Sequence, residues 1–261
     1  MAKTILITGA GSGFGKLAAF DLARKGHHVI ATAEIWPQVT ALKQEAQAQN
    51  VALEVDRLDV TNERDRQNAG KWDIDVLFSN AGVMEAGPIA EQPLDLLRHM
   101  FDVNVLSPVA LAQVFAQKMV AKRSGKIVFN SSMAGLWTVP YVAGYCATKH
   151  AIEAIAEGMK TELAPFGVKV ATINPGVFGT GFNDRGVDAM SRWYDPSRNF
   201  TRPEAFGGVA EALANQLDPQ SMADVIVDVL LADSPKFRNV HPKETEDFIK
   251  QLQKDAWDAM S

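Results

Sequence analysis

Three side chains able to move or hold a proton stand at a regular spacing in the middle of the chain. Tyr145 and Lys149 are four residues apart in Tyr145-Cys146-Ala147-Thr148-Lys149, and Ser132 precedes Tyr145 by thirteen positions. On an α-helix, residues four apart are separated by about 6 Å along the axis and share a face, so the phenol and the ammonium can serve one site. A cation at ~4 Å, at an effective dielectric near 20, lowers the pKa of a phenol by about three units. The spacing therefore predicts Tyr145 as a general acid/base that Lys149 activates.

Alternate glycines follow an apolar segment close to the first residue. The run Gly9-Ala10-Gly11-Ser12-Gly13-Phe14-Gly15 lies between the apolar residues 4–8 and an amphipathic helical pattern over residues 14–25. Glycines allow a tight strand-to-helix turn and let backbone N–H groups approach a pyrophosphate at the helix N-terminus. A flexible surface turn is the alternative, but the strand before the run and the helix after it favour dinucleotide binding.

The elements that must position these residues alternate along the chain. Short β-branched runs predict strands over residues 4–8, 29–33, 51–55, 74–78, 126–130 and 168–173. Helical patterns cover residues 14–25, 37–49, 93–123 and 145–164, the third as a pair broken around Pro108. This alternation predicts an α/β fold: a single doubly wound Rossmann domain over residues 1–261, with a mostly parallel sheet of about seven strands and helices on both faces.

Within that domain we expect three functional regions. Residues 1–110 form mainly the cofactor-binding half, and residues 126–180 form the catalytic core. Regularity lapses after Pro175-Gly176 and returns near Pro203, which predicts a substrate-binding flap over residues 177–215. Further helices are expected over residues 204–216, 221–231 and 244–257.

Composition narrows the class of protein. The 261 residues are 47% hydrophobic and 22% charged, enough to bury a substantial core. The net charge of −5 and the lack of a basic stripe predict that nucleic acid is not a partner. We find no signal-peptide layout and no apolar stretch of about 18 residues, and so expect a cytoplasmic protein with no membrane contact. Cys146 is the only cysteine and is interpreted as packing, and the five histidines have no metal-site spacing, so no metal is expected.

Taken together, these motifs resemble those of the short-chain dehydrogenase/reductase family. The residues Thr8 to Gly15 are similar to its Thr-Gly-x-x-x-Gly-x-Gly signature. The family's order continues with Asp59-Val60-Thr61, Ser79-Asn80-Ala81-Gly82, Asn104, Ser132, Tyr145 with Lys149, and Pro175-Gly176. The resemblance covers roughly residues 3–180. Two departures are that Ser79 stands where Asn is commoner, and that residues 61–75 are short for the usual helix.

The resemblance implies roles for individual residues. Ser132 holds the substrate oxygen, with Ser131 in support, and Asn104 binds a proton-relay water or, alternatively, is a buried Asn bonding backbone at a helix irregularity. Lys149 also binds the nicotinamide ribose. The catalytic set is Asn104, Ser132, Tyr145 and Lys149. The cofactor-binding set is Thr8, Gly9, Gly11, Ser12, Gly13, Phe14, Gly15, Glu34, Asp59, Val60, Asn80, Ala81, Gly82, Tyr145, Lys149, Pro175, Gly176, Val177 and Thr180.

Glu34 bears on the choice between NAD and NADP. It ends the second predicted strand, one place after the position that resembles the ribose-binding acid of NAD-dependent relatives. A carboxylate there would oppose a 2′-phosphate by roughly 1 to 3 kcal/mol. NAD is therefore the expected cofactor and NADP the weaker candidate. The alternative is that Glu34 points to solvent and leaves Lys16 or Arg57 free to meet a phosphate. Asp59 is expected at the adenine, or else as a turn-forming residue.

Aromatic and apolar side chains predict a hydrophobic substrate pocket. The predicted substrate-binding set is Ser132, Ala134, Trp137, Tyr141, Tyr145, Phe178, Phe182 and Trp193. Such a lining suits a small hydrophobic secondary alcohol or ketone. Two alternatives stay open: the aromatics are packing anchors, or flap arginines, including Arg185, meet a carboxylate or phosphate.

The sequence thus predicts an oxidoreductase that moves hydride reversibly between a nicotinamide cofactor and a hydrophobic secondary alcohol or ketone. The alternatives are an NADPH-dependent carbonyl reductase and a catalytically silent dinucleotide-binding regulator. The resemblance also implies a homodimer or homotetramer that uses the helices over residues 93–123 and 145–164.

Overall fold

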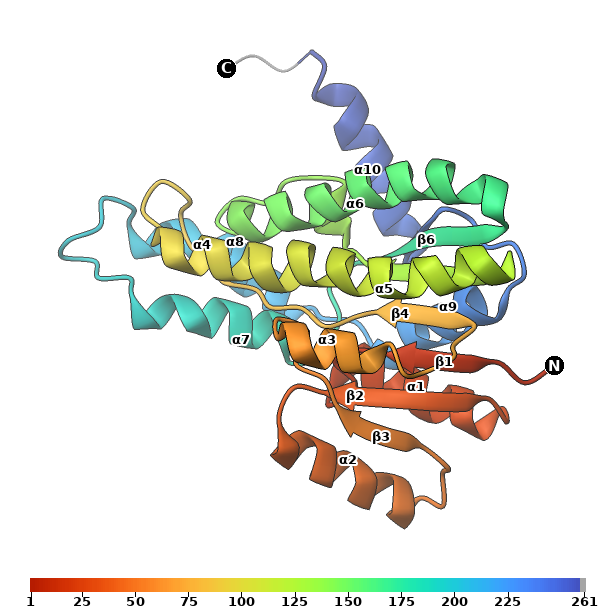
Figure 1. Cartoon of the computed structure of the whole chain (residues 1–261). Coiled ribbons are helices and arrows are strands. Elements are labelled where there is room, and N and C mark those ends of the chain that lie inside the picture. Colours follow the sequence, from red (N-terminus) through yellow and green to blue (C-terminus); the bar gives the residue numbers. More distant parts are fainter. Residues whose placement is uncertain (259–261) are drawn as a thin grey trace.

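The computed structural model describes residues 1–258, except for the side chain at position 210, as one seven-stranded sheet between two layers of helices (Figure 1). All strand pairs are parallel, in the order β3-β2-β1-β4-β5-β6-β7. The strands are β1 Thr4–Ile7, β2 His28–Ala33, β3 Glu54–Arg57, β4 Val76–Ser79, β5 Gly125–Asn130, β6 Val168–Pro175 and β7 Arg238–His241. The predicted doubly wound Rossmann fold is confirmed.

The sheet has an apolar core on each face because successive side chains of a strand point in opposite directions. Ile5 and Ile7 belong to the core under α1 Gly13–Arg24, α2 Trp36–Ala48 and α9 Pro219–Leu231, whereas Leu6 belongs to the opposite core. That second core is covered by α3 Glu63–Ala69, α4 Leu94–Phe101, α5 Ser107–Lys122 and α6 Ala143–Leu163. The remaining helices are α7 Phe182–Asp188, α8 Gly207–Ala214 and α10 Lys243–Asp255.

The long helical stretch after β4 differs from its prediction. It does not break at Pro108; instead a π-helical turn, Asp102–Leu106, joins α4 to α5. Pro108 lies in the first turn of α5, where its missing N–H is tolerated. The wide turn contains Asn104, and such bulges are frequent at functional sites.

Two further elements depart from expectation. The short segment after Thr61 still holds a helix, α3, whose N-terminus is capped by Asn62. The seventh strand, Arg238–His241, did not stand out as an apolar run because it is a half-exposed edge strand. Strand β3 lies about three residues later than predicted.

The stretch Leu94–Lys122 also corrects an expectation about membranes. By length and composition alone it is apolar enough to cross a bilayer, with a mean hydropathy of 1.2, which the sequence reading missed. Half of the 18-residue window to which that hydropathy refers is buried inside the protein. Leu111, Phe115 and Met119 pack in the core beside β4 and β5, which accounts for the apolar character.

The flap after β6 is more ordered than its sequence suggests. Besides α7 and α8 it contains 3₁₀ turns over Ala189–Arg192 and Pro203–Phe206. A parallel bridge between Phe178 and Leu217 joins its two ends.

Candidate active site

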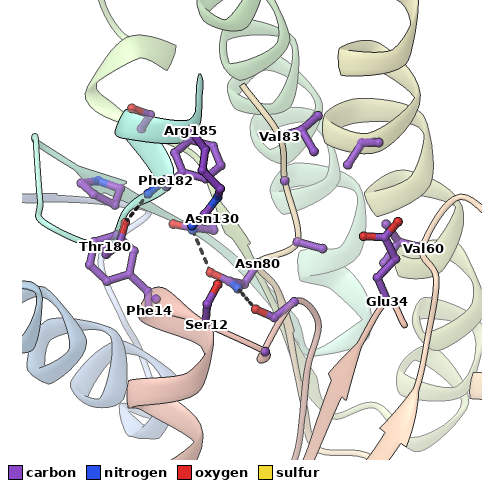
Figure 2. A pocket seen from close by; sticks show the side chains of 18 of the residues that line it. Ser12, Phe14, Glu34, Val60, Asn80, Val83, Asn130, Thr180, Phe182 and Arg185 are labelled. Atoms are coloured by element: carbon purple, nitrogen blue, oxygen red, sulfur yellow. Dashed lines mark hydrogen bonds between the residues drawn. The ribbon is translucent and has the colours of Figure 1, made fainter. Parts of the chain in front are cut away.

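One cavity of about 580 Å³ brings the glycine run and the predicted catalytic residues together. It lies where the carboxyl ends of β1 and β4 meet, the point at which strand order reverses and open α/β sheets bind ligands. Figure 2 shows Phe182 and Arg185 on the flap side of this cavity, and Glu34 beside Val60 at a distance from them. The cavity is therefore long, with two chemically different ends.

The glycine loop forms a cradle that side chains would fill. Gly9 has φ of +65°, and a Cβ there would lie 2.8 Å from the Ala81 Cα. A Cβ on Gly15 would lie 2.7 Å from the Gly9 carbonyl oxygen. Gly9, Gly11, Ser12, Gly13 and Phe14 line the cavity at the start of α1, where N–H groups are unpaired by the helix. The loop fits a dinucleotide pyrophosphate.

Two polar side chains support this cradle from behind. The Thr8 hydroxyl is buried and accepts the backbone N–H groups of Asn80 and Ala81, each at 3.0 Å. The Asn80 amide donates to the Thr8 and Gly9 carbonyls at 2.9 and 3.2 Å and accepts from the Asn130 amide at 2.9 Å (Figure 2). Thr8 and Gly15 therefore shape the loop, and among the described residues neither belongs to the cavity wall.

The end of the cavity remote from the flap carries acidic side chains. Glu34 is exposed and lines the cavity with Asp59 and Val60. The Asp59 carboxylate accepts from the backbone N–H of Thr61 at 2.9 Å and from its hydroxyl at 2.7 Å, so it stabilises a turn as well as lining the wall.

The two cations considered for a 2′-phosphate are paired with carboxylates, and Arg57 also approaches Asp59 of the cavity wall at 3.9 Å. Lys16 pairs with Glu45 at 3.1 Å, and Arg57 pairs with Asp65 at 2.9 Å. Within residues 1–258, neither cation is part of the cavity wall.

Ser132, Tyr145 and Lys149 line the same cavity wall at the nicotinamide end expected from the sequence. Ser132 follows β5 and caps a 3₁₀ turn, with its hydroxyl accepting the Ala134 N–H at 3.1 Å. Tyr145 and Lys149 occupy successive turns of α6 and are both buried. The Lys149 ammonium donates to the Asn130 carbonyl at 2.7 Å and lies 5.5 Å from the centre of the Tyr145 ring.

Burial shifts the pKa of both members of this pair. Burial raises the pKa of Tyr145, and the Ser132 hydroxyl opposes that change. Burial lowers the pKa of Lys149 to about 8, while the carboxylate of Glu153 raises it. The effect of Lys149 on the phenol stays a prediction, because desolvation by burial is the largest influence on the pKa of Tyr145 in this arrangement.

The Asn104 side chain forms hydrogen bonds to two separate parts of the chain. Its side chain accepts the Val83 N–H at 2.9 Å and donates to the Val83 carbonyl at 2.8 Å and the Thr148 hydroxyl at 3.1 Å. It therefore ties the loop after β4 to α6, which matches the alternative of a buried Asn at a helix irregularity. Its side chain does not form part of the wall among the residues described, and a relay role stays a prediction.

The predicted substrate wall divides into two groups. Phe178 and Phe182 line the cavity, and the Phe182 ring is 5.9 Å from the Tyr145 ring. Trp137 packs on Phe248 of α10, and Tyr141 packs on Phe206 of the flap. Over residues 1–258, the wall excludes Ala134, Trp137, Tyr141, Val177 and Trp193. Trp137, Tyr141 and Trp193 therefore act as packing anchors against other aromatic rings, the alternative left open by the sequence.

Several wall residues were missed by the sequence analysis. Thr61 ends the motif Asp59-Val60-Thr61 but was not assigned to the site, and Val83 directly follows Ser79-Asn80-Ala81-Gly82, whereas Gln38, Leu58, His99 and Val103 have no local signal. The flap contributes Asn183 and Arg185, of which Arg185 was considered only as an alternative. Asn130 and Ser131 complete the additional lining residues.

Comparison with known proteins agrees with this geometry. The chain is 36% identical over 185 residues to the uncharacterized oxidoreductase YusZ of Bacillus subtilis, covering 68% of this chain and 66% of that protein. It is 30% identical over 258 residues to human 17-beta-hydroxysteroid dehydrogenase type 1, covering 91% and 77%.

A solved structure of a short-chain dehydrogenase from Streptomyces avermitilis superposes with a TM-score of 0.82 at 28% identity, covering 98% of this chain and 94% of that one. The profile of the family described as short chain dehydrogenase matches residues 3–190. The chain therefore belongs to the short-chain dehydrogenase/reductase family and is an NAD(P)-dependent oxidoreductase.

Proposed function

We propose that this protein transfers a hydride reversibly between NAD and a hydrophobic secondary alcohol or ketone. The observation that carries the proposal is the convergence of Ser132, Tyr145 and Lys149 on one cavity with the glycine cradle. The cradle holds a dinucleotide at one end, and the three side chains act on a carbonyl or hydroxyl oxygen at the other.

Each side chain has a distinct task. When bound, the nicotinamide cofactor supplies the hydride donor or acceptor. The Ser132 hydroxyl orients the substrate oxygen, and Tyr145 exchanges a proton with that oxygen. With an ordinary pKa of about 10 a phenol holds a proton at neutral pH that it can donate during ketone reduction, and burial raises the pKa of Tyr145 further. Lys149 supplies the positive charge that favours loss of this proton in the reverse direction.

NAD is favoured over NADP by the charges around the adenosine end. Glu34 lines that end and opposes a 2′-phosphate, whereas Lys16 and Arg57 are paired with carboxylates. The nearest rival, an NADPH-dependent carbonyl reductase, would need one of these cations to be released.

A hydrophobic substrate is supported by Phe182, which lines the cavity with its ring 5.9 Å from the Tyr145 ring. The human relative is named for a hydroxysteroid, a bulky apolar secondary alcohol. We therefore propose cyclic and aryl-substituted secondary alcohols and their ketones as the substrate class.

The test compares initial rates with NAD(H) and NADP(H) over a panel of such alcohols and ketones, followed by absorbance of the reduced nicotinamide. We expect a preference for NAD(H) of about fivefold to a hundredfold, reduced about tenfold by Glu34→Ala. Glu63→Ala, which alters an exposed carboxylate on α3, is the control and should leave the preference unchanged. A strong NADPH preference in the unmodified protein would reject the NAD assignment.

A silent regulator gives a different result in the same assay. It would bind NADH, seen as quenching of tryptophan fluorescence, and turn over none of the panel. Turnover of any ketone with either cofactor excludes it.

A further inference from the structure

A buried carboxylate lies one turn beyond Lys149 on the same helix. Tyr145, Lys149 and Glu153 follow one another at intervals of four residues, so they share one face of α6. Glu153 is only 4% exposed, yet among the described residues it is not part of the cavity wall. A buried carboxylate is costly unless its oxygens are bound, so its partners should reveal its role.

Both carboxylate oxygens of Glu153 are occupied. One accepts from the Asn174 amide at 2.7 Å, and the other accepts from the Arg238 guanidinium at 2.8 Å. Asn174 is fully buried in β6 and also donates to the Ser132 backbone carbonyl at 3.3 Å. Glu153 thus connects the helix that carries Tyr145 and Lys149 to the backbone of Ser132.

The charge of Glu153 is only partly neutralised by Arg238. The Arg238 side chain is 42% exposed and also pairs with Glu157 at 3.1 Å. The ionisable side chains along this part of α6 are Tyr145, Cys146, Lys149, His150, Glu153 and Glu157, and Arg238 of β7 binds both glutamates. Of the two carboxylates Glu153 is the buried one, so it is the one whose field is least screened.

We propose that Glu153 is a positioning residue for the hydride transfer proposed above, on which this inference rests. Through Asn174 it holds the Ser132 backbone in place, and through its charge it keeps the proton on the Tyr145–Lys149 pair. Burial lowers the pKa of Lys149 to about 8, and the carboxylate of Glu153 raises it. This direction agrees with a charge that keeps the proton on the pair.

The first variant is Glu153→Gln, measured as kcat/KM for ketone reduction against pH. Gln keeps the oxygen that accepts from Asn174 and removes the charge, and it places an N–H donor where the other oxygen accepts from Arg238. The rate falls at alkaline pH when the coupled pair loses a proton. Removing a negative charge lowers the pKa of both members, so we expect the midpoint of this alkaline limb to move about 0.5 to 1 pH unit toward acid.

Two further variants test whether the direction of the shift follows the sign of the charge that is removed. Arg238→Gln removes a positive charge while leaving the Glu153 carboxylate, and should move the same limb toward alkali. Glu157→Gln is the matched control, because its side chain is 57% exposed and screened by solvent. It should leave the midpoint within error.

A binding readout separates a charge effect from a damaged fold. All three variants should bind NADH, by tryptophan fluorescence, within about threefold of the unmodified protein, as expected where packing is kept. If Glu153→Gln does not fold, Arg238→Gln still carries the test. The inference is wrong if the alkaline limb of the pH profile stays in place in both Glu153→Gln and Arg238→Gln. It is also wrong if the limb moves in the same direction in both variants. An unmodified protein without turnover would instead reject the proposed function.

Discussion

The catalytic phenol is governed by two opposing effects at the level of single residues. Burial withdraws Tyr145 from water and raises its pKa, whereas a nearby ammonium lowers the pKa of a phenol. Here burial is the larger effect on the phenol, and the Lys149 ammonium lies 5.5 Å from the centre of its ring and donates to the Asn130 carbonyl. Its help to the phenol depends on Glu153 keeping it charged.

Tyr145→Phe should lower kcat by about 10²- to 10⁴-fold, the usual contribution of a general acid/base. The fold should remain intact, because the ring and its packing against Phe182 are retained. Initial rates, circular dichroism and NADH binding measure the two effects separately. Tyr141→Phe is the control and should keep full activity, since that ring packs on Phe206 and lies off the cavity wall within residues 1–258. A Tyr145→Phe protein with unchanged kcat would mean that another group donates the proton.

At the scale of elements, one carboxylate of the loop after β4 binds three successive residues of the flap. Glu91 accepts from the Asn199 amide at 2.9 Å and from the backbone N–H groups of Phe200 at 2.6 Å and Thr201 at 3.1 Å. These hydrogen bonds lower the pKa of Glu91 against the effect of desolvation. The same flap supplies Phe182 to the cavity wall. We therefore expect the position of that wall to depend on a contact remote from the chemistry.

Glu91→Gln should raise KM for the ketone about threefold to tenfold while leaving kcat within about twofold. One of its two acceptor oxygens becomes an amide that donates instead, and an unpaired hydrogen-bonding group costs about 1 kcal/mol or more. Steady-state kinetics measure the change, and limited proteolysis should cut more quickly near residues 195–206. Glu204→Gln, at an exposed carboxylate on the same flap, serves as the control. Unchanged KM and cleavage rate in Glu91→Gln would show that this contact does not hold the flap.

At the scale of the whole molecule, sheet order creates the cavity and leaves an apolar helix surface uncovered. The chain leaves the sheet in opposite directions after β1 and β4, which opens a crevice at their carboxyl ends. On the α4–α5 side, Leu94 is 62% exposed and Leu106 is 60% exposed. We propose that this surface joins copies of the chain in a homodimer or homotetramer.

Leu106→Glu should shift the protein toward monomers, because a charge at an apolar contact between copies would be desolvated without a partner. Size-exclusion chromatography with light scattering measures the mass. Trp36→Glu, which alters a 60% exposed side chain on α2 across the sheet, should leave the assembly unchanged. A monomeric unmodified protein, or an unaffected Leu106→Glu oligomer, would reject this surface.

The features that the sequence by itself determined are local ones. The interval between Tyr145 and Lys149 places both on one helix face, and the glycine run after β1 demands a turn that side chains would block. Alternating strand and helix patterns predict a parallel sheet because each crossover helix returns the chain in the same direction. Each of these features is determined by residues within one helix or strand, or within the turn that connects two of them.

Only the tertiary structure decided which distant side chains meet. Trp137 turned toward α10 instead of the cavity, Asn104 toward Val83, and the ammonium of Lys149 toward a carbonyl of β5. The contact between Glu153 and Arg238 joins residues 85 positions apart, and no spacing rule relates them. Such contacts depend on the angle at which elements pack and on how deeply each side chain is desolvated. Those quantities arise only when the whole chain has closed around its sheet.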